Sequence, residues 1–155
     1  MQIVKDQPQR KPVFGRVAND DFEARAVARS VVSSSLLKAA VHGRDPNWGR
    51  VLSAAGNAHL PDAAMLGLAG MDSAIAGARA GTPVEIDVPR LRVSICGTLV
   101  FAGQPVSFDP AAVRALMDAS EISIELDLGA GDGAGEAFGC DLTEAYVVEN
   151  SAYST

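Results

Sequence analysis

The sequence predicts an α+β fold: a mixed, mainly antiparallel sheet with helices packed on one face. Residues 21–80 carry apolar side chains at the spacing of helices. Residues 82–128 instead contain segments in which apolar and polar side chains alternate, as in half-buried strands. A short helix that begins at Asp109-Pro110 separates two of these segments. Helices grouped before strands indicate α+β rather than alternating strand–helix units.

The composition is that of one globular domain. The chain has 155 residues, of which 48% are hydrophobic and 21% are charged. Its net charge of −6 and pI near 4.8 argue against a general nucleic-acid or anionic-membrane binder. No apolar run reaches the roughly 18 residues of a membrane span, and the first residues lack a signal-peptide core. We therefore expect a cytoplasmic enzyme or enzyme subunit, with no nucleic-acid or membrane partner.

The sequence contains no visible metal site and no complete catalytic set. Cys96 and Cys140 are too few and too far apart for a disulfide framework or a zinc site. His42 and His59 are the only histidines, and no G-x-S-x-G nucleophile elbow occurs. Cys140 is a candidate nucleophile, but its apolar surroundings favour a buried structural residue. We expect no cofactor, no metal and no catalytic residue on this chain.

The chain is predicted to begin irregularly and then to become helical. Polar residues and two prolines favour a flexible arm over residues 1–12, and residues 13–155 are predicted to form a single domain that opens with a short strand. A helix over residues 21–40 follows, with capping chemistry from the aspartates at its start. The serines at residues 33–35 interrupt good helix formers and predict a break there. A later helical pattern covers residues 61–80.

The stretch KAAVHGRDPNWGR, from Lys38 to Arg50, is the most distinctive in the chain and holds its only Trp. Gly43 can end the preceding helix in a left-handed conformation. Asp45 and Pro46 can then start the next helix as N-cap and first helical residue. On local grounds this is a tight connection between two helices, with Trp48 in the core.

Alternation and turn residues predict the strands of the second half, and the apolar periodicity and caps predict two helices there. The run GAGDGAG after the cleanest strand lacks the Lys-Ser/Thr of a phosphate-binding loop, and a helix does not clearly follow it. It therefore favours a hairpin turn whose return strand pairs with that cleanest strand. The predicted strands are residues 82–88, 91–95, 99–101, 122–128 and 135–138, and the predicted helices are residues 109–117 and 142–149.

Two separated motifs give the chain a family resemblance. The first is GRDPNWGR, preceded by Lys38 five residues before Gly43. The second is GCDLT, followed by Tyr-Val, Asn150, a Tyr and Thr155. Together they resemble the bifunctional ornithine acetyltransferase (glutamate N-acetyltransferase) family. The resemblance covers about residues 13–155 and corresponds to the C-terminal part of the family's β chain.

The resemblance implies that the reactive residue is elsewhere. Members of that family cut themselves before a Thr, which then takes an acetyl group from N-acetylornithine and passes it to glutamate. Here residue 1 is Met, no Ala-Thr-Met-Leu cleavage sequence or DGEGATK stretch occurs, and Ala39 stands where the family usually has Thr. We therefore expect a hetero-oligomer, with a partner chain that carries the N-terminal Thr nucleophile and the oxyanion hole. The chain would form one lobe of this larger assembly.

The same resemblance implies which residues of this chain serve the site. Asn150 and Thr155 match the family positions that bind the substrate amino acid, and both side chains can donate and accept hydrogen bonds. Without the motif, Asn150 is an ordinary helix C-terminal residue and Thr155 a frayed end. Other motif residues are expected to form a scaffold near the site, with Arg50 pairing with a carboxylate and Trp48 in packing. These scaffold residues are Lys38, Asp45, Asn47, Trp48 and Arg50.

The sequence thus predicts a subunit or fragment of a glutamate N-acetyltransferase-like acyltransferase that supplies the C-terminal substrate-binding tail. The alternative is a non-catalytic amino-acid-binding or protein-interaction module derived from the same family. A further alternative is acyl transfer with a different amine or acyl donor, because an Asn recognises only a generic amino-acid group.

Overall fold

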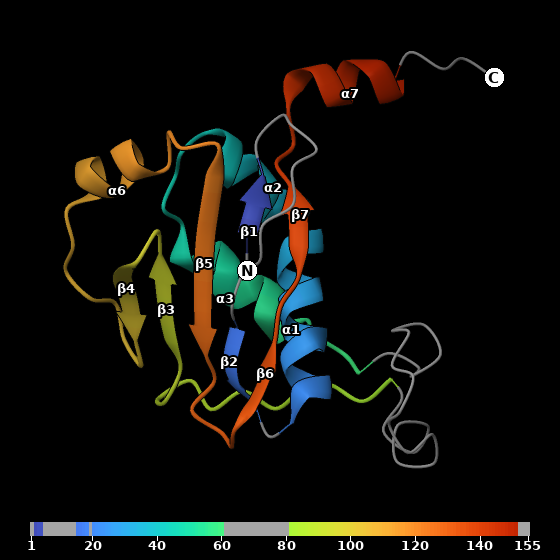
Figure 1. Cartoon of the computed structure of the whole chain (residues 1–155), viewed down its shortest axis with the longest axis vertical. Coiled ribbons are helices and arrows are strands. Elements are labelled where there is room, and N and C mark those ends of the chain that lie inside the picture. Colours follow the sequence, from blue (N-terminus) through green and yellow to red (C-terminus); the bar gives the residue numbers. More distant parts are fainter. Residues whose placement is uncertain (1, 5–14, 19, 61–80, 152–155) are drawn as a thin grey trace.

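A computed structural model describes residues 2–4, 15–18, 20–60 and 81–151 of the 155-residue chain. They form a seven-stranded sheet with helices against it (Figure 1). The predicted helix at residues 61–80 lies outside the described residues. Among the helices of the described part, none is long and apolar enough to cross a membrane. The described residues also hold no group of three or more His, Cys, Asp or Glu side chains that could bind a metal ion.

The sheet is mixed and mainly antiparallel, as predicted. Its main path runs β4-β3-β5-β1-β7, and β2 pairs with both β5 and β6. The β1–β7 and β2–β5 pairs are parallel, whereas the other four pairs are antiparallel. The strands are β1 (Gln2–Val4), β2 (Gly15–Ala18), β3 (Arg92–Ile95), β4 (Thr98–Ala102), β5 (Glu121–Asp127), β6 (Gly133–Gly135) and β7 (Phe138–Cys140).

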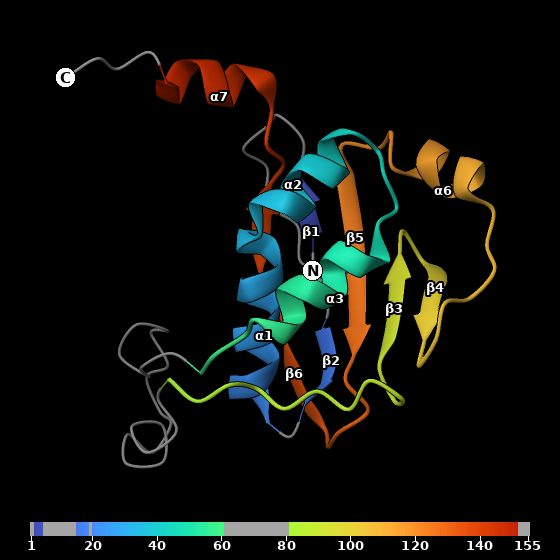
Figure 2. The same cartoon turned by 180° about the vertical axis from the view of Figure 1, so that it is seen from behind.

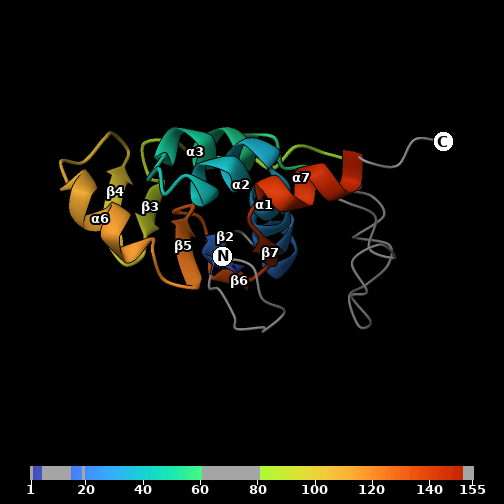
Figure 3. The same ribbon diagram turned by 90° about the horizontal axis from the view of Figure 1, so that it is seen from above.

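Three helices cover one face of the sheet, which confirms the predicted layering. They are α1 (Asp21–Ser33), α2 (Ser35–His42) and α3 (Trp48–Gly56), and Figure 2 shows them in front of the strands. The view from above in Figure 3 shows the same two layers. The helix α6 (Pro110–Leu116) lies beside β4, and α7 (Glu144–Ser151) lies beyond the end of β7 (Figure 1).

The break between α1 and α2 lies at the predicted serines. Asp20 caps α1, because its carboxylate accepts a hydrogen bond from the Glu23 amide at 2.9 Å. Ser34 has an extended backbone and caps α2 by accepting from the Leu37 amide at 3.3 Å. A residue that caps one helix cannot continue the previous one, so the chain turns there.

The core lies between β5, its neighbours and the three helices. On β5, Ile122, Ile124 and Leu126 are buried and alternate with more exposed residues, as the sequence predicted. They belong to one buried cluster with side chains of α1 that include Phe22 and Val31. Burial of side chains of this size stabilises the fold by roughly 1.5–3 kcal/mol each.

Two predicted strands are wrong. Residues 82–88 form only an isolated bridge between Pro83 and His59 and then an irregular segment. Only Val84 is buried there, and Val88 is 49% exposed. Prolines on both sides remove backbone donors, so alternation alone does not place this segment in a sheet. The return strand predicted at residues 135–138 is also wrong, because Gly135 ends β6, which pairs with β2, and Phe138 begins β7, which pairs with β1.

Close packing of β6 on α1 explains both the pairing and the glycines of the GAGDGAG run. A Cβ atom at Gly133 would collide with the backbone of Asp20. A Cβ atom at Gly135 would collide with the backbone of Arg25, at 2.5 Å from its nitrogen. The glycines thus let the strand pass against the helix, and the run is not a simple hairpin that returns along β5.

The predicted flexible arm at residues 1–12 is wrong for residues 2–4. These residues form β1, between β5 and β7 in the sheet. Ile and Val are β-branched and favour such a position, whereas the polar residues and prolines that predicted an arm come later. The rest of the arm lies outside the described residues.

Candidate functional site

The connection between α2 and α3 is built differently from the prediction. Gly43 has φ −75°, and the left-handed residue is Arg44, with φ 55°. Three interactions hold this uncommon conformation. The Arg44 amide donates to the Val41 carbonyl at 3.1 Å, the Asp45 amide donates to the Ala40 carbonyl at 2.8 Å, and the Arg44 guanidinium contacts Asp118 at 2.7 Å.

Asn47, and not Asp45, is the N-cap of α3. Its side-chain oxygen accepts from the Arg50 amide at 3.1 Å. Its side-chain nitrogen donates to the Asp45 carboxylate at 2.9 Å, which fixes the orientation of the Asn47 amide. Asp45 therefore supports the cap from outside the helix. Both residues stabilise the local turn.

The remaining scaffold residues join neighbouring elements. Trp48 is half-buried, and its ring lies 5.2 Å from the ring of Phe101 on β4, which ties α3 to the sheet. The predicted pairing of Arg50 with a carboxylate is not found among the described residues. Arg50 instead donates to the Leu36 carbonyl at 2.7 Å and so connects α3 to α2. Lys38 lies half-buried on α2.

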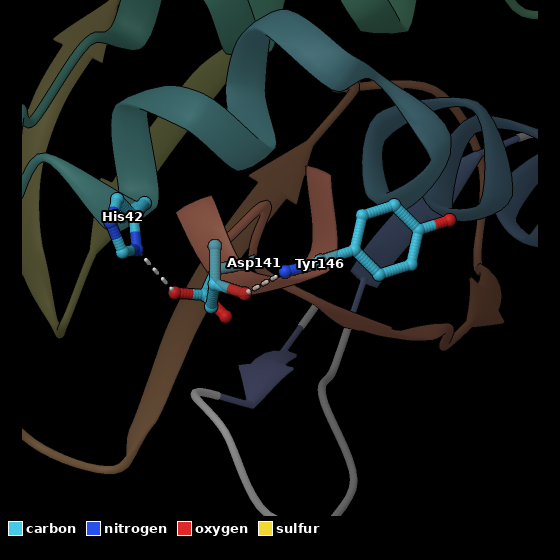
Figure 4. Close-up of polar contacts among 4 residues, drawn as sticks. His42, Asp141 and Tyr146 are labelled. Carbon is cyan, nitrogen blue, oxygen red and sulfur yellow. Dashed lines mark hydrogen bonds and ion pairs between the residues drawn. The ribbon is translucent and has the colours of Figure 1, made fainter. Parts of the chain in front are cut away.

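A contact that the sequence did not predict brings the two motifs together. His42 Nδ1 lies 3.1 Å from Asp141 Oδ2, although the two residues are 99 positions apart in the chain (Figure 4). The His42 side chain is 43% exposed and the Asp141 side chain only 3%. A carboxylate only accepts hydrogen bonds, so Nδ1–H is the donor. The other oxygen, Asp141 Oδ1, is buried without a hydrogen-bond partner in the described part of the chain.

The segment after β7 leads directly from this contact into the last helix. Gly139 packs closely on Val32 of α1, where a Cβ atom would approach the Val32 Cβ to 3.0 Å. Thr143 caps α7, because its hydroxyl accepts from the Tyr146 amide at 3.0 Å. Cys140 is exposed, which corrects the prediction that it is buried.

Of the two predicted substrate-binding residues, the structure places only one. Asn150 lies in α7. Thr155 lies outside the described residues. The apolar side chains of α7 are largely uncovered, with Tyr146, Val147 and Val148 between 50% and 65% exposed.

His42 and Asp141 are the site residues that the sequence reasoning missed. Each stands inside one of the two motifs, His42 in KAAVHGRDPNWGR and Asp141 in GCDLT. The contact could have been suspected from the sequence, because histidine and aspartate side chains often form hydrogen-bonded pairs.

The fold and these motifs agree with comparisons to known proteins. The model of the ArgJ family matches residues 13–155, and the chain belongs to this family. The arginine biosynthesis bifunctional protein ArgJ of Deinococcus radiodurans is 40% identical over 138 residues, which are 89% of this chain and 29% of that protein. The glutamate N-acetyltransferase of Methanopyrus kandleri is 35% identical over 142 residues, which cover 89% of this chain and 30% of that protein.

A solved structure confirms the fold class. The crystal structure of the arginine biosynthesis bifunctional protein ArgJ of Bacillus halodurans superposes with a TM-score of 0.71 at 30% sequence identity. The match covers 92% of this chain and 56% of that one. The chain thus spans about three tenths of the length of the curated relatives named above.

Proposed function

We propose that this chain is part of a glutamate N-acetyltransferase-like acyltransferase, in which it supplies the C-terminal substrate-binding tail. The reaction is transfer of an acetyl group from N-acetylornithine to glutamate, or a related acyl transfer between amino acids. Membership of the ArgJ family supports the proposal, as do relatives named for arginine biosynthesis and for glutamate N-acetylation.

One observation carries the proposal to particular residues: the GCDLT motif and Asn150 form one continuous structural unit. Asp141 contacts the body of the protein, Thr143 caps α7, and Asn150 lies near the end of the same helix. An Asn amide can donate to a substrate carboxylate and accept from its ammonium group. In this proposal Asn150 and Thr155 bind the amino-acid part of the substrate, as the family resemblance implies.

The Thr nucleophile lies on another chain. Two of the described threonines lie inside folded elements, since Thr143 caps α7 and Thr98 begins β4. The nucleophile's hydroxyl oxygen would attack the acetyl carbon and release ornithine, and the glutamate amine would then take the acetyl group from the ester. The exposed apolar side chains of α7 suit a helix that is covered by such a partner.

The test is purification of the protein from its native cells, with intact mass measurement and an assay of acetyl transfer from N-acetylornithine to glutamate. We expect a second chain that begins with Thr and a complex that transfers acetyl. In that complex, Asn150→Ala should raise the KM for the amino acid by about tenfold or more, because a buried substrate charge loses a hydrogen bond.

The matched control is Glu149→Ala, an exposed neighbour on the same helix, which should leave the kinetic constants unchanged. A purified chain that transfers acetyl at a normal rate by itself would overturn the placement of the nucleophile. A chain that purifies alone, is inert and still binds an amino acid would instead support the non-catalytic module.

A further inference from the structure

The helix α7 lies at the margin of the described structure. It is beyond the end of β7, above the two layers of the fold (Figures 1 and 2). Every side chain of α7 whose burial is described is exposed. Among the described residues, no buried side chain of α7 fixes its direction. The short segment that joins α7 to β7 connects the helix to the body of the protein.

Within that segment Asp141 is the buried residue. Its side chain is 3% exposed, whereas Leu142 and Thr143 are half-buried. Its hydrogen bond to His42 is the long-range polar contact of this segment in the described structure. Thr143 then caps α7 only two residues later, so the position of Asp141 and the start of the helix are coupled through one short stretch of backbone.

The carboxylate depends strongly on His42. Asp141 Oδ1 is buried without a partner in the described residues, and Oδ2 bonds to His42. Removal of the His42 donor would leave a buried carboxylate with no hydrogen bond from this part of the chain. Such a group is costly to keep away from water, and movement of residues 141–143 toward solvent relieves that cost. That movement would redirect α7.

The donor itself is available in either charge state of the imidazole. Nδ1 carries a proton in the imidazolium ion and in the neutral tautomer that this carboxylate selects. The contact is therefore a permanent structural connection.

We propose that His42 and Asp141 are positioning residues: their contact sets the direction of α7 and so presents Asn150 to the substrate. This explains why motifs 99 residues apart belong to one site. The effect on substrate binding rests on the proposed function, whereas the effect on the direction of α7 does not.

The first readout is the distance distribution between two nitroxide labels, measured by pulsed electron resonance on the purified protein in its native assembly. The labels are placed at exposed positions 125 on β5 and 149 on α7, through a non-natural amino acid so that both cysteines remain. We expect His42→Phe, which keeps a ring but loses the donor, to broaden or shift the distribution. We expect His42→Asn, which keeps a donor near the position of Nδ1, to restore it.

The control is His59→Phe, which changes the other histidine, an exposed residue far along the chain, and should leave the distribution unchanged. Near-ultraviolet circular dichroism of Trp48 verifies that each variant is folded, and His42→Ala replaces His42→Phe if the latter does not fold. An unchanged distribution in a folded variant without the donor would overturn the proposal.

The second readout is acetyl transfer by the assembled enzyme. His42→Phe should raise the KM for the amino acid by about tenfold, with a smaller change in kcat, since a binding group is misplaced. His42→Asn should recover most of this loss. If no assembly transfers acetyl, the proposed function fails, and the label distances still decide whether the contact positions α7. A KM that is unchanged although α7 is redirected would overturn the link to Asn150.

Discussion

The energetic coupling between His42 and Asp141 is the sharpest test of the structure. His42→Ala leaves a carboxylate whose side chain is 3% exposed and whose other oxygen already has no partner among the described residues. A hydrogen bond to a charged group contributes about 1.5–3 kcal/mol, and loss of one partner of a buried charge costs up to about 3–5 kcal/mol. Because the His42 side chain is 43% exposed, water can approach the site, so we expect the lower range, about 2 kcal/mol.

A double-mutant cycle of His42 and Asp141 separates the energy of their hydrogen bond from the loss of other contacts of His42. Asp141→Ala removes the buried charge together with its need for a donor, so in that background His42→Ala should cost only about 0.5 kcal/mol. The coupling energy is then about 1.5 kcal/mol. Urea unfolding followed by the fluorescence of Trp48, the only tryptophan, measures each variant.

The control for this cycle is His59→Ala, which should cost less than about 0.5 kcal/mol because it removes an exposed side chain. If His42→Ala costs no more than this control, or if the two single changes add without coupling, the buried pair does not stabilise the fold and the reasoning is refuted.

Three further predictions concern the backbone around the site, and all are measured by urea unfolding. Gly133→Ala should destabilise the fold by about 3 kcal/mol or more, because its Cβ would overlap backbone atoms before α1. Gly56→Ala, with open space around it, should instead stabilise the fold by about 0.5 kcal/mol. Equal effects of the two changes would contradict the close approach of β6 to α1. Asn47→Ala should cost about 1–2 kcal/mol through loss of the α3 cap, and a neutral result would show that the cap is dispensable. Arg44→Gly should be neutral or stabilising, since relief of the φ of 55° is worth about 1 kcal/mol and the exposed ion pair with Asp118 is worth less. A loss of stability above about 1 kcal/mol would show that the ion pair contributes more than the backbone strain costs.

Local patterns were sufficient wherever the structure depends on residues that are close in the sequence. Asp20 and Ser34 cap their helices by hydrogen bonds across three residues, so the start of α1 and its break from α2 were predictable. The alternation of Ile122, Ile124 and Leu126 likewise predicted β5. Caps and alternation are short-range signals, and they place elements but not their partners.

The errors concern pairing, which depends on distant residues. Alternation over residues 82–88 resembled a strand, but no strand of the described sheet pairs with it beyond the Pro83–His59 bridge. The return segment after β5 pairs with β2, because its glycines let it pass against α1. Neither outcome can be derived from a window of ten residues, since each depends on which backbone lies alongside in the folded chain.

In the candidate site, too, local contacts were predictable and contacts between distant residues were not. The motif was recognisable, and part of its polar chemistry is used within a few residues, because Asn47 caps α3 and binds Asp45. Arg50 instead reaches the Leu36 carbonyl, 14 residues away. The turn between the two helices was predicted, but Asn47 and not Asp45 is the N-cap, and Arg50 bonds to a backbone carbonyl and not to a carboxylate. His42 was missed because its partner lies 99 residues away.

These contacts indicate what the first motif does in this chain. Asp45, Asn47 and Arg50 hold the connection between α2 and α3, and that connection in turn fixes the end of α2. His42 is the residue at that end which reaches the second motif. A rigid connection between α2 and α3 keeps His42 in place, and His42 contacts Asp141 in the segment that leads into α7. On the proposal made above, the motif supports the tail helix, and a substitution in it should affect substrate binding through the direction of α7.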